Sequence, residues 1–248
     1  MEKISILMIY NDKLAYDDAQ FDQSIRSLID QNYDNWELIL IDERGQNSSY
    51  PEVTKADKII HLPLDFKNRA HSINRGLAKC NGAFVAIVNN EQSQITFRLS
   101  SLELFLHVAK RHDDTGMVYA DYRLIEADGS EKDIHLLNYH TGRLRDNMDF
   151  GAVWFFPKKV LDQIKGMDES YQATHWYDLR LRASENHSIY HIEAKQNGHL
   201  YFTKAPAKTH NVFDYLLAGK DVQLEMEKAV TEHLKRTGAY LAPGQNYN

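Results

Sequence analysis

The chain has 248 residues, a formal net charge of −6 and 43% hydrophobic residues. That length and composition fit a single α/β domain with a sizeable core. The acidic balance, with lysines and arginines scattered along the chain, argues against a nucleic-acid-binding surface. No apolar run approaches the roughly 20 residues that a membrane-spanning helix needs. With a single cysteine, Cys80, the sequence fits a cytoplasmic protein.

The first part of the chain alternates between strand patterns and helix patterns. Continuous apolar runs are typical of strands buried on both faces, and apolar residues at helical spacing lie between them. In chain order, we expect a strand at Ile4–Tyr10, a helix from about Phe21 to Asn32, strands at Trp36–Ile41 and Lys58–Leu62, a helix at Arg69–Lys79 and a strand at Phe84–Val88. This alternation predicts a doubly wound, mostly parallel central sheet flanked by helices.

The second part of the chain is less regular. Strands and helices are still expected, with a hairpin turn at Asp128-Gly129. The strands are expected at Met117–Glu126, Ala152–Phe156 and His199–Phe202, and the helices at Arg98–Ala109, Lys158–Ile164, Leu179–Glu185 and Tyr215–Thr237. No repeat and no linker rich in Pro, Gly or Ser divides the chain. We therefore expect one domain over residues 1–248.

Polar residues follow three of the predicted strands at the point where each strand ends. They are Tyr10-Asn11, Asp42-Glu43 and Asn89-Asn90-Glu91. Because the carboxyl ends of parallel strands meet at one edge, and sheets of this kind bind ligands there, these groups should gather at one site. The turn after the first strand, Asn11-Asp12-Lys13, lacks G-x-G-x-x-G, which disfavours a dinucleotide-dependent oxidoreductase.

Several short motifs also occur in a characteristic order between about residues 4 and 185. They are ISILMIYN from Ile4, Ser27 to Gln31, the strand that ends at Asp42, Asn74-Arg75-Gly76, Gly82, Gly166-Met167-Asp168-Glu169 and Asp178-Leu179-Arg180-Leu181-Arg182. In this order the sequence resembles family 2 glycosyltransferases of the GT-A fold. The resemblance implies a bacterial enzyme of polysaccharide biosynthesis that transfers a sugar, with inversion, from a nucleotide diphosphate-sugar to a glycan or lipid-linked acceptor.

Two motifs depart from that family pattern. Asn89-Asn90-Glu91 stands where the family carries Asp-x-Asp, and His175-Trp176 stands where it usually carries Glu-Asp. Two interpretations therefore stay open. The chain is either an active transferase of the hexosyltransferase type or a catalytically silent GT-A module that binds a nucleotide-sugar, a glycan or a partner domain.

The resemblance implies roles for residues that follow the first two strands. Asp42 is expected to accept an N–H of a pyrimidine base, so that a UDP-sugar is the favoured donor, and Glu43 stands in the second acidic position. Tyr10 either stacks on the base or packs the rim of the sheet. Arg69 either pairs with the diphosphate or is a surface arginine. Asn89 can hydrogen-bond a ribose hydroxyl.

Glu91 is the acidic group left in the altered Asp-x-Asp segment. Mg²⁺ needs as few as one or two protein carboxylates beside phosphates and waters. A divalent metal, Mg²⁺ or Mn²⁺, is therefore expected to bind weakly and only with the donor, with His210 as a second candidate ligand. The alternatives are a solvated loop glutamate and a structural histidine.

The catalytic base is expected near the altered Glu-Asp position. His175 is chemically able because an unperturbed imidazole titrates near pH 6.5. If residues 174 to 178 are helical, Asp178 points away from the side on which Trp176 lies; if they are extended, the two share a face. A third possibility is that neither His175 nor Asp178 acts and that Trp176 stacks on sugar or packs in the core.

The resemblance also implies that different segments of the chain have different functions. Residues 1–95 should form the nucleotide-binding half, 96–210 the acceptor half, and 211–248 a C-terminal helix and tail. The polar tail from Ala242 suits a linker to a further domain, so a second transferase domain is one expected partner. A lipid-linked acceptor would bring the protein to the inner face of the membrane.

Overall fold

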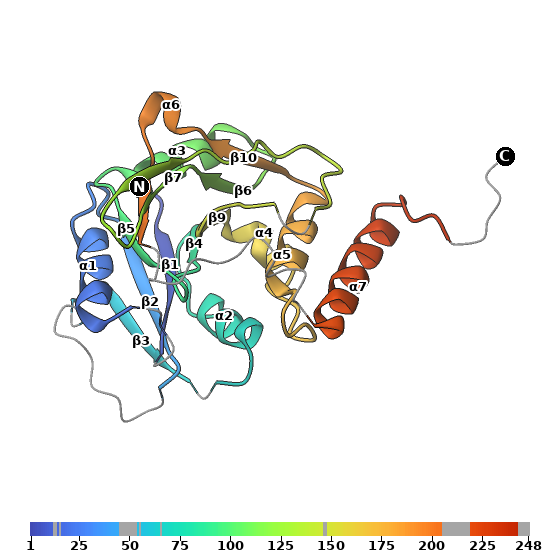
Figure 1. Ribbon diagram of the computed structural model, residues 1–248, viewed down its shortest axis with the longest axis horizontal. Helices are drawn as coiled ribbons and strands as arrows, with labels where there is room; N and C mark the ends of the chain where they lie inside the picture. The colour runs from blue at the N-terminus through green and yellow to red at the C-terminus, as the bar shows by residue number, and fades with distance from the viewer. Residues whose placement is uncertain are drawn as a thin grey trace.

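The computed structural model describes residues 1–11, 14, 16–44, 54, 56–64, 66–145, 148–204 and 219–242. Within these residues, seven strands form a central sheet in the order β10-β6-β9-β4-β1-β2-β3 (Figure 1). The strands are β1 (Ile4–Tyr10), β2 (Trp36–Asp42), β3 (Ile59–Pro63), β4 (Phe84–Val88), β6 (Thr115–Ala120), β9 (Val153–Pro157) and β10 (Ser188–Ile192).

The sheet is mostly parallel, as the sequence predicts. Strands β4, β1, β2 and β3 run parallel to one another, and β10 runs parallel to β6, whereas β9 is antiparallel to both of its neighbours. In this register Tyr10 lies opposite Asp42. The carboxyl ends of β1, β2 and β4 therefore meet at one edge.

A second sheet of four strands has the order β5-β11-β7-β8. Its strands are β5 (Gln94–Phe97), β7 (Tyr122–Ile125), β8 (Glu131–Ile134) and β11 (Tyr201–Lys204). The predicted hairpin is confirmed, because β7 and β8 pair in antiparallel fashion around Gly129, whose φ is 84°. The single strand expected over Met117–Glu126 is wrong: it is two strands that belong to different sheets, with a break at Asp121.

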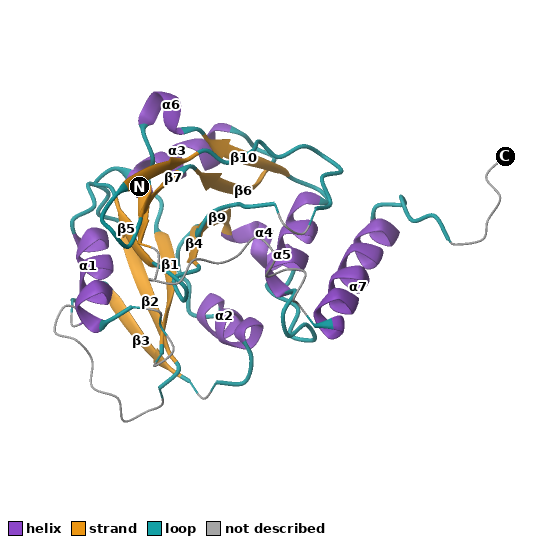
Figure 2. Cartoon of the chain, viewed as in Figure 1, coloured by secondary structure: helices purple, strands orange, loops and turns teal. Residues whose placement is uncertain are grey.

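Helices cover both faces of the central sheet (Figure 2). They are α1 (Asp18–Ile29), α2 (Arg69–Leu77), α3 (Ser101–Arg111), α4 (Lys158–Gln163), α5 (His175–Ser184), α6 (Ala194–Asn197) and α7 (Lys220–Arg236). Alternate residues of β1 face two different cores: Ile6 and Met8 pack with α1 and α3, whereas Leu7 and Ile9 pack with α2, α4 and α5. Burial on both faces explains why β1 is a continuous apolar run.

Three residues of the family-like motifs hold the scaffold together. Asn74 in α2 donates to the carbonyl of Met167 and accepts from its N–H, both at 2.9 Å, which fixes the Gly166–Glu169 turn on α2. A side chain at Gly76 would come within 2.6 Å of Ile41, and one at Gly82 within 2.6 Å of the backbone of Ser5. Such contacts leave no room for a larger residue.

Helix α7 lies beside α5, on the side away from the sheet (Figure 1). Its described part begins at Lys220, so residues 215–218 of the expected C-terminal helix lie outside the described residues. Glu185, at the end of α5, accepts hydrogen bonds from His233 at 3.0 Å and Arg236 at 2.7 Å. Among the described helices, none has the length and apolar character needed to span a bilayer.

Candidate functional site

Three carboxylates gather at the carboxyl ends of the parallel strands. Asp42 ends β2 and is fully buried, Glu43 follows it with a side chain only 3% exposed, and Glu91 follows β4 and is partly buried. Removing a carboxylate from water is unfavourable unless a positive group or hydrogen-bond donors compensate for it. Two arginines supply that compensation here.

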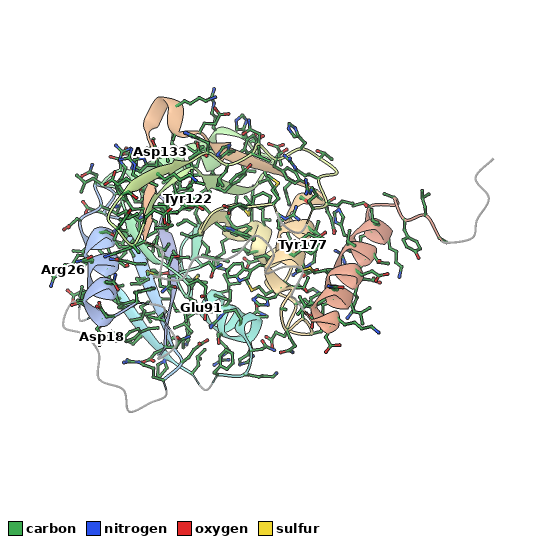
Figure 3. The ribbon with its side chains drawn as sticks, viewed as in Figure 1. Asp18, Arg26, Glu91, Tyr122, Asp133 and Tyr177 are labelled. Atoms are coloured by element: carbon green, nitrogen blue, oxygen red, sulfur yellow. The ribbon has the colours of Figure 1, made fainter. Side chains whose placement is uncertain are left out.

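Arg69 bridges two of these carboxylates. It is the first residue of α2, and its guanidinium donates through Nη1 to Glu43 and through Nη2 to Glu91. The Arg69 side chain is 11% exposed, so it is not a surface arginine. Asn11, at the end of β1, donates to the other oxygen of Glu43 at 2.9 Å. The structure thus brings Arg69 together with Glu43 and Glu91, the two carboxylates that the sequence predicted at one edge; Glu91 is labelled in Figure 3.

Arg44 pairs with the third carboxylate. Its Nε and Nη2 donate to Oδ1 and Oδ2 of Asp42, each at 3.0 Å, and its backbone N–H donates to Oδ1 at 2.9 Å. The same guanidinium lies over the ring of Tyr10, 3.9 Å from the ring centroid. Sequence reasoning missed Arg44; its position directly after the Asp42-Glu43 pair was the available signal.

Tyr10 is buried at this edge rather than open to a ligand. Its ring stacks on Phe21 of α1 at 4.4 Å, and its hydroxyl donates to Asp18 at 2.9 Å. Burial and the hydrogen bond to Asp18 raise the pKa of Tyr10 to about 12, against the opposing effect of Arg44. Tyr10 therefore stays protonated at physiological pH.

The two asparagines after β4 differ in their surroundings. The Asn89 side chain is exposed, while its backbone N–H donates to the carbonyl of Ala152 at 2.8 Å. Asn90 is fully buried, accepts from the N–H of Ile9 at 3.0 Å, and donates to the Ile9 carbonyl and the Tyr16 hydroxyl. An amide can serve both backbone groups because it donates and accepts. Asn90, which the sequence left without a role, therefore fastens the end of β4 to β1.

The described residues do not fit a resident divalent metal. No cluster of three or more His, Cys, Asp or Glu side chains suited to a cation occurs among them. The carboxylates of Glu43 and Glu91 both pair with Arg69. His210, the other expected ligand, lies outside the described residues.

His175 begins α5 and is 6% exposed. Neither ring nitrogen has a hydrogen-bond partner within the described part of the chain. Burial, with the positive charge of Arg69, lowers the pKa of His175 to about 4, although the Gln172 backbone and Glu225 oppose the shift. His175 is therefore a neutral imidazole at physiological pH, close to the arginine that bridges Glu43 and Glu91.

Asp178 lies within helix α5, so the extended alternative for residues 174 to 178 is not realised. Its buried carboxylate accepts from Arg182 Nε at 2.7 Å, and Arg182 also donates to the carbonyls of Ile164 and Gly166. Trp176 packs edge-on against Trp154 of β9, 5.1 Å between centroids. Asp178 thus has a structural partner, and Trp176 packs against the core.

The segment before α5 is held by a carboxylate from α7. Glu225 accepts from the backbone N–H groups of Gln172, Ala173 and Thr174 at 3.0 to 3.3 Å and from the Thr174 hydroxyl at 3.2 Å. Consecutive N–H groups at the start of a helix favour an anion. Glu225 therefore fixes the approach to His175, and nothing in the amphipathic pattern of α7 indicated this contact.

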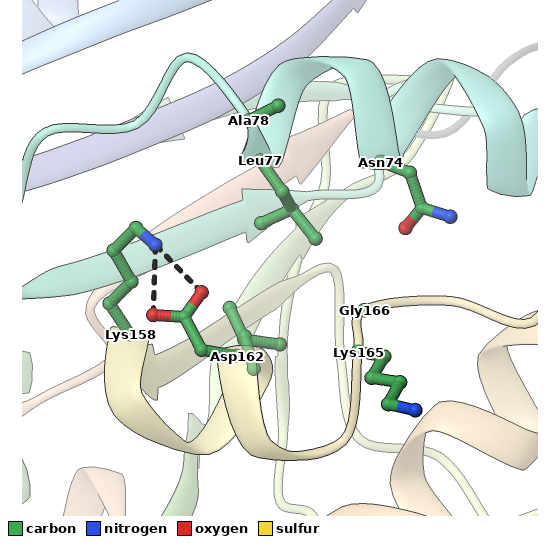
Figure 4. A pocket seen from close by; sticks show the side chains of 8 residues that line it. Asn74, Leu77, Ala78, Lys158, Asp162, Lys165 and Gly166 are labelled. Atoms are coloured by element: carbon green, nitrogen blue, oxygen red, sulfur yellow. Dashed lines mark hydrogen bonds and ion pairs between the residues drawn. The ribbon is translucent and has the colours of Figure 1, made fainter.

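One pocket of about 360 Å³ lies between α2 and α4 (Figure 4). Its lining includes Asn74, Leu77 and Lys165, and the Lys158 ammonium beside it pairs with Asp162 at 2.7 Å. It contains none of the three clustered carboxylates. At the carboxyl edge of the sheet, those carboxylates pair with the side chains of Arg44 and Arg69.

Residues 6–92 match the model of glycosyl transferase family 2. The predicted family resemblance is confirmed over this segment, which contains Asp42, Glu43, Arg69 and Glu91. A comparison with curated proteins gives no match.

Solved structures of glycosyltransferases share the architecture. S. aureus TarS residues 1–349 in complex with UDP has a TM-score of 0.62 at 11% identity, over 96% of this chain and 72% of that one. The mannosyltransferase PcManGT from Pyrobaculum calidifontis, in complex with GDP-Man and Mn²⁺, has a TM-score of 0.60 at 9% identity, over 97% of this chain and 65% of that one. The chain has the GT-A fold. It spans 44% of a longer TarS structure. These neighbours show the fold, and the family match over residues 6–92 supports a role in glycosyl transfer.

The lowered pKa of His175 predicts a pH-dependent stability. Because His175 is neutral in the folded protein down to about pH 4 and takes up a proton near pH 6.5 when unfolded, the unfolded state binds more protons between these values. Stability should be complete above pH 6.5 and fall as the pH drops toward 4, by about 2–3 kcal/mol for this group. Urea unfolding at pH 7 and pH 5 should show a smaller difference for His175→Gln than for the wild type. An equal difference in both proteins would contradict the assignment.

Proposed function

We propose that the chain transfers a sugar from a nucleotide diphosphate-sugar to a glycan or lipid-linked acceptor, with inversion at the anomeric carbon. The observation that carries this proposal is the convergence of Asp42, Glu43, Arg69 and Glu91 at the carboxyl edge of the sheet. Sheets of this kind bind nucleotides at that edge. The TarS and PcManGT structures hold UDP, UDP-GlcNAc and GDP-Man, which supports a nucleotide-sugar donor; a UDP-sugar and a hexosyl group remain our expectation.

Each residue at the edge has a proposed contact with the donor. Asp42 accepts an N–H of the base, the ring of Tyr10 stacks on it, and Asn89 binds a ribose hydroxyl. Arg69 binds the diphosphate by exchanging a carboxylate oxygen for a phosphate oxygen, since a guanidinium fork suits both anions. Glu43 then keeps Arg69 oriented through the Nη1 contact.

A weak, donor-dependent divalent metal remains a prediction, with Glu91 and His210 as its proposed protein ligands. Glu91 is available only when Arg69 turns from it to the diphosphate. The phosphates and waters would then supply the remaining oxygen ligands, and the bound cation would neutralise phosphate charge. The divisions at residues 95 and 210, the position at the inner face of the membrane and a second transferase domain also remain predictions.

The proposed reaction needs a base for the acceptor hydroxyl. The bond from the acceptor oxygen to the anomeric carbon forms as the bond from that carbon to the phosphate oxygen breaks. The hydroxyl proton passes to His175, and the nucleoside diphosphate leaves with its negative charge facing Arg69. A base with a pKa near 4 is weak. A bound diphosphate would raise the pKa of His175, because it adds negative charge beside Arg69.

A silent binding module is the second candidate, and the residues of α5 favour it. Asp178 pairs with Arg182, and Trp176 packs against Trp154. No carboxylate of these residues is left to take the proton, and His175 is a weak base in the nucleotide-free protein. Such a module would bind a nucleotide-sugar, a glycan or a partner domain without turnover.

Removal of the Asp42 carboxylate tests the nucleotide site. Asp42→Ala should weaken UDP binding by at most about 1.5–3 kcal/mol, the range for a hydrogen bond to a charged group, because the wild-type carboxylate must first give up its bonds to Arg44. Calorimetric titration of UDP, GDP and dTDP into wild type and variant measures this. Asp34→Ala, which removes a carboxylate that is 92% exposed, serves as the matched control and should bind as the wild type does. Unchanged affinity in Asp42→Ala would remove Asp42 from the site.

The metal prediction is checked by the same titration with Mn²⁺. Because Glu43 and Glu91 both pair with Arg69, we expect no stable Mn²⁺ complex without nucleotide and weak binding when UDP is present. Glu91→Gln should abolish the Mn²⁺ binding that depends on UDP. A tightly held cation in the nucleotide-free protein would show that other ligands take part.

Release of nucleotide from the donor separates the transferase from the binding module. The donors are UDP-GlcNAc and GDP-Man, and the acceptor is water. If His175 is the base, His175→Ala should lower the rate of nucleotide release on the order of 10²-fold. Asp178→Asn should mainly lower stability, because it breaks the pair with Arg182. These two substitutions decide which of the two residues, if either, acts as the base. If the wild type binds a nucleotide-sugar but releases no nucleotide, the binding module is correct.

A further inference from the structure

We propose that the guanidinium of Arg44 occupies the position of the nucleobase, so that a nucleotide enters the site only by displacing it. The proposal rests on the proposed nucleotide site and adds a residue that controls access to it. Arg44 contacts both groups expected to recognise the base, the Asp42 carboxylate and the Tyr10 ring. Its planar group with parallel N–H donors resembles the edge of a base stacked on an aromatic ring.

The ring of Tyr10 offers only one face to a base. Phe21, which is fully buried in the core, stacks on the ring at 4.4 Å with an interplanar angle of 17°. Arg44 lies 3.9 Å from the ring centroid, and two groups at such distances cannot share one face. Because Phe21 is part of the core, a base that stacks on Tyr10 must take the face that Arg44 covers.

Arg44 also blocks access to the Asp42 carboxylate. It has no exposed surface, and both of its oxygens accept from the Arg44 side chain at 3.0 Å. A base N–H reaches Asp42 only after these two bonds break. The backbone N–H of Arg44, 2.9 Å from Oδ1, can stay in place during that exchange.

The exchange explains why an arginine stands at this position. Without a nucleotide, Asp42 would be a buried charge without a partner, which is unfavourable. Arg44 compensates for that charge, and the N–H groups of an incoming base take over the same role. The Arg44 side chain is 14% exposed, so its guanidinium lies at the rim and can turn toward solvent. Binding therefore includes the loss of one stacked ion pair, which lowers the apparent affinity.

Two variants test the proposal. Arg44→Ala removes the competing group, and Arg44→Lys keeps the charge without the fork. Calorimetry with UDP and GDP at fixed ionic strength gives Kd, and thermal unfolding without ligand gives Tm. If the conformation with Arg44 displaced makes up 1–10% of the free wild type, Arg44→Ala should bind about 10- to 100-fold more tightly. The Kd of Arg44→Lys should lie between those of the wild type and Arg44→Ala. Both variants should unfold at a lower Tm, because Asp42 loses its bidentate partner.

A lower Tm together with tighter nucleotide binding identifies the role of Arg44. An arginine that only stabilises the fold would lower Tm without tightening Kd, and one that grips the nucleotide would weaken binding; either result overturns the proposal. Arg26→Ala, an exposed arginine on α1 (Figure 3), is the matched control and should change neither quantity. If Arg44→Ala does not fold, Arg44→Lys decides by the same criterion.

The outcome for the wild type separates this proposal from the proposed function. If the wild type binds UDP or GDP and Arg44→Ala binds no more tightly, the displacement model is wrong and the nucleotide site stands. If the wild type and the Arg44 variants all fail to bind UDP and GDP, the nucleotide site is wrong, and the displacement model with it. Binding by Arg44→Ala alone would support both.

Discussion

The need to compensate buried carboxylates organises the carboxyl edge of the sheet. Asp42 and Glu43 are almost completely buried, and each is paired with one arginine, Arg44 or Arg69. Arg69 extends this pairing to Glu91 and so joins the ends of β2 and β4 through the first turn of α2. A ligand at this edge must therefore exchange with existing ion pairs, and its affinity is a difference between two sets of contacts.

Most residues of the family-like motifs serve the scaffold rather than the chemistry. Asn74 ties a distant turn to α2, Gly76 and Gly82 permit close packing, and Asp178 orients Arg182 toward the Gly166 carbonyl of that turn. These roles depend on the fold and not on a substrate. They explain how motif order predicted the GT-A fold while the altered Asp-x-Asp and Glu-Asp positions left activity open.

The sequence predicted the elements whose patterns are set locally. Strands β1, β2 and β4 are apolar on both faces and were predicted to within a residue, whereas β8 is mostly exposed and gave no such pattern. The meeting of Asp42, Glu43 and Glu91 at one edge followed from topology alone, since parallel strands end together. Arg44 was overlooked although its partner Asp42 lies two residues away, whereas Asn90 and Glu225 could not be predicted, because their partners come from tertiary packing. The same holds for the break at Asp121, whose carboxylate accepts from His191 and the backbone of Leu136.

Arg69 also links the carboxyl edge of the sheet to α5. Burial lowers the pKa of His175 most, and the charge of Arg69 lowers it further, while Glu225 opposes the shift. Arg69 thus helps to keep His175 neutral and weakly basic. In the proposed function, a diphosphate bound to Arg69 would add negative charge and make His175 a stronger base. Donor binding and proton acceptance would then be coupled through one guanidinium, and His175 would be least able to accept a proton in the site without donor.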